Sequence, residues 1–271
     1  MRDGGAAAKE QRFVFHPGAV PTAREAEEAI AVMFKGHGGY APEALPVFER
    51  ARLINFVQCN ASTCKLDLRA AFPAAKALAF IDSPAEHVTR ALSRLPEAKC
   101  IRITLCALDA PLVRAVAQRA DGARLSISDI SADLIEEFAA AIPAGARPND
   151  ISLSVHRDAD ELPDALAAIP SLTSLNIAGC AKIAHLPAAP LTHLRHFYAA
   201  GSGIARFPDW IGACHRMLAV IIHECPHVPA LVDSLPDAWL GADTPEIFLA
   251  PKDYARIPLD HPWYPNLISS D

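Results

Sequence analysis

The amino-acid sequence predicts an α/β solenoid, in which a series of short coils each contributes one strand to a parallel sheet. Three observations lead to this fold class. Pairs of apolar residues at strand spacing recur every 22 to 28 residues, a small polar or thiol side chain follows most pairs at a fixed distance, and helix-forming or turn-forming segments fill the intervals. Periods in this range are typical of repeat proteins whose coils stack on one another.

The clearest coil is SLTSLNIAGCAKIAHLP, residues 171–187. It matches the leucine-rich-repeat pattern LxxLxLxxN/CxL through Leu172, Leu175, Ile177, Cys180, Ile183 and Leu186. A second coil, PLTHLRHFYAAGSGIARFP, follows at residues 190–208. The sequence therefore predicts a leucine-rich-repeat solenoid of about eight repeats, with a parallel sheet on its concave side.

Eight apolar residues mark the predicted strands. They are Ile54, Leu78, Ile101, Leu125, Leu153, Leu175, Phe197 and Val220. Another apolar residue lies two positions after each marker, which is the period of a strand with one buried face. The longest interval separates Leu125 from Leu153, and we attribute it to a loop-like insert at residues 143–150.

A structural ladder is expected five positions after each marker, where a small side chain turns inward and bonds to the backbone of the neighbouring coil. Its members are Cys59, Ser83, Cys106, Asp158, Cys180, Ser202 and Cys225. Ile130 is the exception. A free cysteine suits this position because it is compact, apolar and a weak donor. The four ladder thiols are therefore predicted to be buried and reduced.

The segments that return from one strand to the next are expected to change along the chain. In the first half they read as helices, one of which begins with a capping box at residues 83–86. From residue 183 onward they are short and rich in proline, as in turns or 3₁₀ pieces. The predicted organisation is a disordered N-terminus at 1–12, a helical N-terminal cap at 13–50, leucine-rich repeats at 51–236 and a C-terminal cap at 237–271. Within the first cap, a helix is expected from Thr22 through Phe34 to Gly36.

Composition excludes several function classes. The net charge is −6 and no run of Lys or Arg occurs, which argues against a nucleic-acid or membrane-surface protein. No stretch approaches the roughly 18 apolar residues of a spanning helix, and no apolar signal segment opens the chain. Seven cysteines without a CxxC pair favour a reducing compartment.

Motifs that resemble catalytic or metal sites do not favour chemistry here. In HECPH, residues 223–227, a strand would turn His223 outward and Cys225 inward, so that they do not converge on one ion. His193 and His196 form an HxxH that precedes a strand rather than lying on a helix. Cys214 and His215 are adjacent and point apart on an extended chain. We expect no catalytic residue, metal or cofactor.

The two coils at 171–187 and 190–208 close on Leu-Pro or Phe-Pro, and Leu235-Pro236 is followed by an apolar strand and Pro251. These features resemble the leucine-rich-repeat effectors that bacteria inject into host cells by type III secretion, over roughly residues 50–251. The resemblance implies a soluble virulence protein, secreted from the bacterial cytoplasm into the host cytoplasm, that binds a host protein. Some members join the repeats to a ubiquitin-ligase domain with a Cys-x-Asp nucleophile, a motif that this sequence lacks.

Binding is expected on the concave face, where residues beside each inward strand residue project outward. The candidates are Tyr198, Ile221, His223, His156, Asn176, Arg102 and His196. Tyr198, Ile221 and His223 gather the large side chains at the C-terminal end, and such groups supply most binding energy at interfaces. Each position is also compatible with a merely solvated strand residue. The alternative functions are a substrate-recognition domain of a larger ligase whose activity lies outside this chain and, less favoured, a self-contained enzyme.

Overall fold

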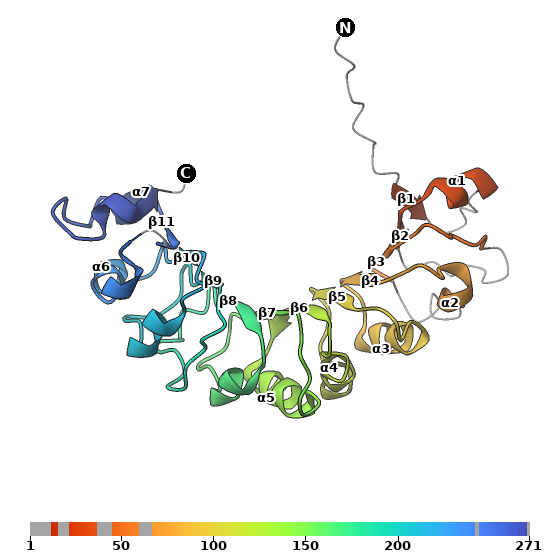
Figure 1. The fold of residues 1–271 in the computed structure, drawn as a ribbon, viewed down its shortest axis with the longest axis horizontal. Coiled ribbons are helices and arrows are strands. Elements are labelled where there is room, and N and C mark those ends of the chain that lie inside the picture. The colour runs from red at the N-terminus through yellow and green to blue at the C-terminus, as the bar shows by residue number, and fades with distance from the viewer. Residues whose placement is uncertain (1–11, 16–21, 37–44, 60–66, 242–243, 270–271) are drawn as a thin grey trace, which may run out of the picture. The chain divides into compact units, whose positions relative to one another are not determined.

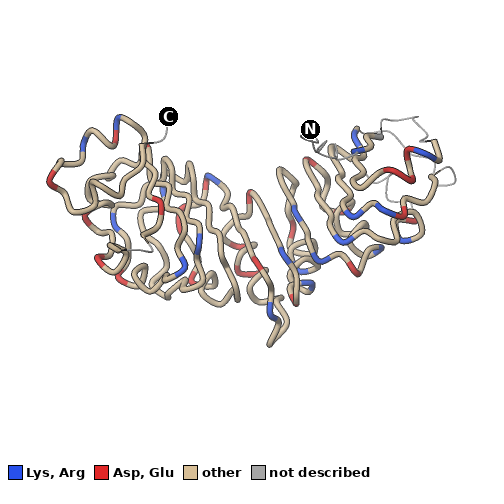
Figure 2. The backbone as a smooth tube through the Cα atoms, turned by 45° about the horizontal axis from the view of Figure 1, so that its top comes forward, with Lys and Arg blue, Asp and Glu red and all other residues tan. Residues whose placement is uncertain are grey.

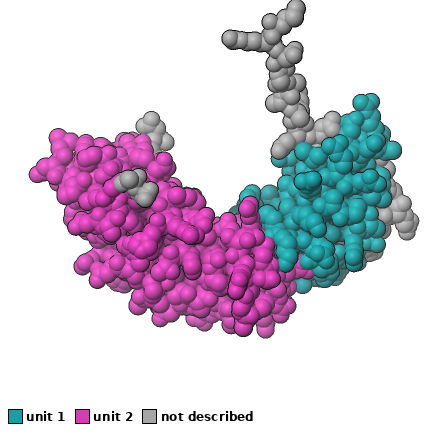
Figure 3. All heavy atoms as spheres, in the orientation of Figure 1, with its two compact units in different colours: residues 1–107 teal, residues 108–271 magenta. Residues whose placement is uncertain are grey.

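The computed structural model of the chain describes residues 12–15, 22–36, 45–59, 67–241 and 244–269. These residues form an α/β protein whose parallel strands follow one another in the sheet in the order of the sequence. One strand per coil is compatible with a solenoid. The chain divides into two compact units, Met1–Ala107 and Leu108–Asp271 (Figure 3), which are described separately.

Unit 1 places its helices on one face of its strands. The strands are β1 (Arg12–Phe15), β2 (Ala31–Lys35), β3 (Leu53–Val57), β4 (Ala77–Ile81) and β5 (Cys100–Thr104). The helices are α1 (Ala23–Glu28), α2 (Leu68–Ala71) and α3 (Ala85–Arg94). Helices α2 and α3 lie on the same side of strands β3 to β5 (Figure 1). The face of the strands turned away from the helices is called the outer face.

Unit 2 repeats this arrangement with shorter returns toward its C-terminal end. The strands are β6 (Arg124–Ile130), β7 (Asp150–Val155), β8 (Leu172–Asn176), β9 (His196–Tyr198), β10 (Ala219–Ile221), β11 (Glu246–Leu249) and β12 (Leu267–Ser269). The α-helices are α4 (Ala110–Ala117), α5 (Ala132–Ala141), α6 (Val228–Asp233) and α7 (Pro251–Tyr254). The 3₁₀ helices are η3 (Asp164–Ala168), η4 (Asp209–Ala213), η5 (Asp237–Trp239) and η6 (Tyr264–Asn266). The returns change from helices to 3₁₀ pieces as predicted, but the change begins at η3, before residue 183, and α6 and α7 beyond it are α-helices.

A stack of phenylalanine rings fills the core of unit 1. Phe34, Phe56 and Phe80 occupy the same register on β2, β3 and β4. Their ring centroids are 5.3 and 5.1 Å apart, the neighbouring planes are within 10° of parallel, and all three are fully buried. The separations are close to the distance between paired strands, so the sheet itself sets the stacking.

Strands in both units end in a left-handed turn at an equivalent position. The turn residues are Gly36, Gln58, Asp82, Leu105, Asp129, Gly179, Gly201 and Glu224, with φ between 49° and 98°. In most of these coils the N–H of the turn residue donates to a carbonyl of the next coil, as from Gln58 to Ile81 (2.9 Å) and from Gly201 to His223 (2.9 Å). The left-handed conformation costs a non-glycine residue roughly 1–2 kcal/mol. This bond between coils helps to offset the cost.

The residue after each turn points inward, and there the thiols of the ladder lie. Cys59, Cys106, Cys180 and Cys225 are buried. The Cys59 thiol donates to the Phe34 carbonyl at 3.4 Å, and the Cys225 thiol donates to the Ala199 carbonyl at 3.0 Å, each in the preceding coil. Burial raises the pKa of Cys106 and Cys225, and it raises the pKa of Cys180 to about 11. Ser83 and Ser202 are buried at the same position.

The prediction for Asp158 is wrong, because its side chain is 77% exposed. The cause is the pairing of β6 with β7. Leu153 pairs with Ile127 rather than with Leu125, and a register shift follows Ser128, so that the buried Ile130 lies beside Val155. A slip of two residues keeps every apolar residue on the inner face, and the apolar pattern cannot distinguish the two registers.

The predicted helical cap at 13–50 is also wrong in part. The capping box of Thr22 and Glu25 is present, but α1 ends at Glu28 and the following residues form β2. Val32 and Phe34 alternate inward and pair with β3, which suits a strand better than a helix. The capping box predicted at residues 83–86 is absent, because Pro84 is the N-cap of α3 and no side chain caps this helix.

Beyond the predicted repeats, β11 forms where an apolar strand was expected before Pro251, and β12 adds a strand that was not expected in the C-terminal cap. At the turn residue Glu224, the acceptor of the turn N–H is a side chain instead of a backbone carbonyl. Asp253 is buried, and its Oδ2 accepts the N–H of Glu224 at 2.6 Å. The carbonyl of Ala250, at the equivalent position in the next coil, accepts the N–H of Asp253 at 2.9 Å instead. Arg256 Nη1 lies 3.3 Å from Asp253 Oδ1.

The thiol positions predict a labelling pattern. In the native protein, Ellman's reagent should react rapidly with the exposed Cys100, whereas the four ladder thiols should react only after denaturant is added. Burial removes access to all four and raises the pKa of Cys106, Cys180 and Cys225. Mass spectrometry of labelled peptides resolves the sites. Rapid native labelling of Cys59, Cys180 and Cys225 would contradict the ladder.

The side chain of His87 predicts acid sensitivity. Its ring lies edge-on against Phe56, with centroids 5.2 Å apart, and burial followed by the charge of Arg90 lowers its pKa from 6.5 to about 4. Between these values the unfolded chain binds a proton that the folded chain does not. Stability should therefore fall by about 2 kcal/mol from pH 7 to pH 5.

Urea denaturation at both pH values measures this loss. His87→Leu should remove most of it, while His215→Gln, at an exposed position, should leave it unchanged. Equal losses in wild type and His87→Leu would assign the acid sensitivity to other groups.

The Asp253 carboxylate is expected to stabilise the C-terminal end of unit 2. Asp253→Ala should lower the free energy of unfolding by about 2 kcal/mol, since it leaves the Glu224 N–H without its charged acceptor. Asp253→Asn keeps an oxygen acceptor and should cost less. Asp260→Ala, at an exposed position, is the matched control in urea denaturation. If Asp253→Ala lowers the free energy of unfolding no more than this control does, the bond to the Glu224 N–H does not stabilise unit 2.

Candidate functional site on the outer face of unit 2

An apolar row crosses the last four strands of unit 2 on the outer face. Strand register places Tyr198 beside Ile221, Ile221 beside Phe248, and Phe248 beside Ile268. Adjacent strands are about 4.8 Å apart, so these side chains are neighbours over about 15 Å. Ile268 is 37% exposed and the other three are half-buried. We call these four residues the apolar row.

Sequence reasoning identified half of this row. Tyr198 and Ile221 were predicted as binding residues, whereas Phe248 and Ile268 were not. The segment around Phe248 was expected to form a strand, and alternation with the buried Ile247 and Leu249 was a signal that Phe248 faces outward. Ile268 gave no comparable signal, because the three-residue β12 lies in the predicted C-terminal cap, where no strand was expected after Pro251.

Three other predicted residues surround the apolar row. The ring of His196 stacks on Tyr198, with centroids 6.4 Å apart and planes 16° from parallel. Asn176 lies beside Tyr198 in register, and its Oδ1 accepts the N–H of Ala178 at 2.8 Å. His223 follows Ile221 by two positions and is half-buried.

The remaining predicted binding residues are not part of this cluster. His156 lies at the end of β7, with ring nitrogens 3.9 Å from carboxylate oxygens of Asp129 and Asp158. Its Nδ1 also accepts the N–H of Asp158 at 3.2 Å, so local acids hold this ring. Arg102 is exposed on β5 and belongs to unit 1.

A hollow of about 600 Å³ opens beside the apolar row, at the N-terminal ends of β9, β10 and β11. Its lining residues are His196, His215, Arg216, Met217, Leu218, Ala219, Thr244 and Glu246. Register places Ala219 between His196 and Glu246. The small side chain of Ala219 leaves space between the two larger ones.

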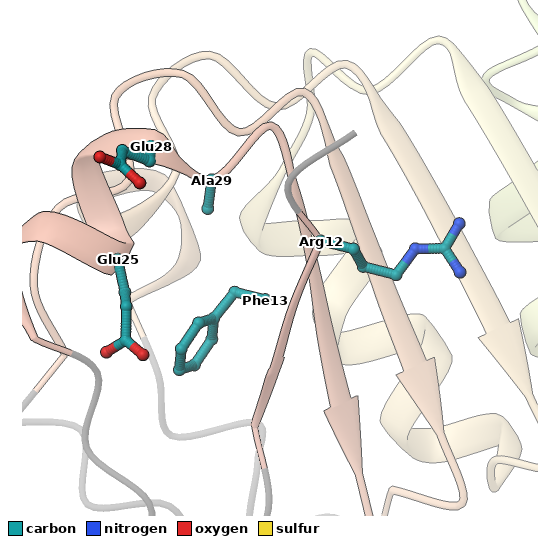
Figure 4. A pocket seen from close by; sticks show the side chains of 5 residues that line it. All are labelled: Arg12, Phe13, Glu25, Glu28 and Ala29. Carbon is teal, nitrogen blue, oxygen red and sulfur yellow. The ribbon is translucent and has the colours of Figure 1, made fainter. Parts of the chain in front are cut away.

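Two other pockets are weaker candidates for a binding site, because charged side chains that line them already pair within the protein. One of about 580 Å³ lies between η3 and the segment that follows β8, where Lys182 Nζ pairs with Asp160 at 2.7 Å. Another, of about 250 Å³, lies in unit 1 beside α1 (Figure 4). Figure 4 shows Phe13 turned toward Glu25 and Arg12 extending the opposite way. Both glutamates of this pocket already act in α1, Glu25 in the capping box and Glu28 in an ion pair with Arg24.

The residues considered for chemistry do not converge. Within the described ranges, no group of three His, Cys, Asp or Glu side chains is placed to hold a metal ion. Cys225 is buried while His227 is exposed at the start of α6. Cys214 is buried, its thiol donates to the Leu191 carbonyl at 3.4 Å, and burial raises its pKa to about 11. Such a thiol stays protonated at neutral pH and is a poor nucleophile.

Charge is distributed without a strong pattern over each unit. Figure 2 shows acidic and basic residues interspersed along the tube, with neither sign gathered in one segment. None of the helices in the described part of the chain combines the length and apolar composition that a membrane crossing needs. On the outer face of unit 2, the apolar row is therefore a more distinctive feature than the distribution of charge.

The sequence matches no known protein-family model, and no curated protein sequence matches it. A functional conclusion therefore depends on the residues of the site itself.

Proposed function

We propose that this chain is a leucine-rich-repeat solenoid that binds a protein partner through the apolar row. The repeat assignment is supported by the strand register, the left-handed turns and the buried thiols, which recur at equivalent positions. The binding assignment rests on one observation, the contiguous row of Tyr198, Ile221, Phe248 and Ile268 on the outer face.

The apolar row has the composition of a binding surface rather than of a solvated sheet. Elsewhere on the outer face of unit 2, the positions in line with the row are Ser128, Ser154 and Asn176. Serine and asparagine give little area to desolvate, whereas aromatic and branched side chains carry most of the binding energy at protein interfaces. A contiguous exposed apolar patch on a soluble protein commonly marks an interaction site.

The resemblance of the coils at 171–208 to injected bacterial effectors supports a host protein as the partner. Free thiols support a reducing compartment, since none of the six cysteines in the described residues forms a disulfide. We include delivery into the host cytoplasm in the proposal on these two grounds.

The proposal predicts that the apolar row is required for partner capture. Tyr198→Ala and Phe248→Ala should each weaken binding by about 2 kcal/mol, or roughly 30-fold, because each removes a large anchor from the row. The immobilised chain and its variants are incubated with eukaryotic cell lysate, and retained proteins are quantified by mass spectrometry. Binding isotherms follow for proteins that depend on the row.

Ser128→Ala is the matched control on the same face, and melting curves should show all three variants to be folded. Proteins retained by wild type and Ser128→Ala but lost from both row variants are the expected result. Retention of the same proteins by every variant would place the interface elsewhere, and the proposal would be abandoned.

A further inference from the structure

The hollow beside the apolar row differs in chemistry from the row itself. Arg216, His215 and His196 supply N–H donors around it, and Leu218, 54% exposed, adds an apolar wall. Arg216 forms no ion pair with any residue that the structure describes. Its charge is therefore available to a ligand, in a chain whose net charge is −6.

Glu246 is the one acidic side chain among the described lining residues, and it lies across the hollow from His196, with Ala219 between them. N–H donors therefore line one part of the hollow, and the carboxylate of Glu246, an acceptor, lies on the β11 side. A ligand that suits both has an anionic group for Arg216 and an N–H group for Glu246. A peptide with an acidic side chain offers both groups.

The distance from the strand residues that line the hollow to the apolar row matches the repeat of an extended chain. His196, Ala219 and Glu246 each precede a row member by two residues on the same strand. Two residues of a strand rise about 6.8 Å, which is also the separation of side chains i and i+2 on one side of an extended peptide. The stacking of His196 on Tyr198 joins the two surfaces without a gap.

The geometry points to an extended acidic peptide segment as the partner element that this site receives, with an Asp or Glu carboxylate in the hollow on Arg216 and an apolar side chain, two residues away, on the row. This inference rests on the proposed function, because it uses the same apolar row. It specifies the chemical class of the partner as an acid-x-apolar segment.

A peptide selection on the full chain tests this inference. Random seven-residue peptides displayed on phage are selected on the immobilised protein, and an enriched peptide is synthesised with a fluorescein label for anisotropy titrations. Enriched sequences should place Asp or Glu two residues from an aromatic or branched residue. Replacing the peptide's acid with the amide should weaken binding about tenfold, because a charge-assisted pair is lost.

Substitutions of residues that line the hollow test the acidic-peptide inference separately from the proposed function. Arg216→Gln should weaken the peptide about tenfold, and added salt should reduce this difference. Glu246→Gln should weaken binding about threefold, because the charged acceptor for the N–H group of the peptide is lost. Arg206→Gln, an exposed arginine on the return from β9 to β10, makes the same charge change away from the hollow and should have no effect.

The outcomes distinguish the inference from the proposed function. Binding that depends on Tyr198 but is unchanged in Arg216→Gln, with enriched peptides lacking acids, overturns the inference and leaves the apolar row as an interface. If no enriched peptide depends on Tyr198, both are overturned. Equal weakening by Arg216→Gln and Arg206→Gln would indicate general attraction of charge and would also overturn the assignment of the hollow.

Discussion

Parallel strands paired in register bring residues from equivalent positions of successive coils to within about 5 Å of each other. Within each unit, side chains of one kind at equivalent positions of successive coils therefore form a continuous feature. Inward phenylalanines become the ring stack of Phe34, Phe56 and Phe80, and outward apolar residues become the row that includes Tyr198 and Ile221. The core and the apolar row are both consequences of the same pairing.

The left-handed turn after most strands extends the hydrogen bonding between coils beyond the strands themselves. Its N–H donates to the next coil, and it directs the following side chain inward, where Cys59, Cys180 and Cys225 form hydrogen bonds with a preceding coil. A non-glycine residue such as Gln58 accepts this conformation despite its local cost. At the last turn of the series, the Asp253 carboxylate supplies the acceptor, so that a side chain replaces the backbone carbonyl of the next coil.

A sheet with helices on one face leaves its outer face free to vary. Residues on that face do not pack in the core, and changes there alter recognition without altering the fold. The apolar row and the hollow beside it show how local this variation is, because neighbouring strands of the same unit present serine and asparagine. The proposed binding surface therefore lies at the C-terminal strands, where large outward side chains occur on adjacent coils.

The sequence by itself determined the α/β class, the positions of the strands from β3 to β11, the burial of four thiols and two members of the apolar row. These features are local, since the period-two pattern and the fixed distance from strand to thiol are visible within one coil. The tertiary structure alone decided the pairing of Leu153 with Ile127, the strand at 31–35, and the outward neighbours Phe248 and Ile268. Register and pairing depend on contacts between coils, and a slip of two residues or a short apolar segment satisfies the same local pattern in more than one way.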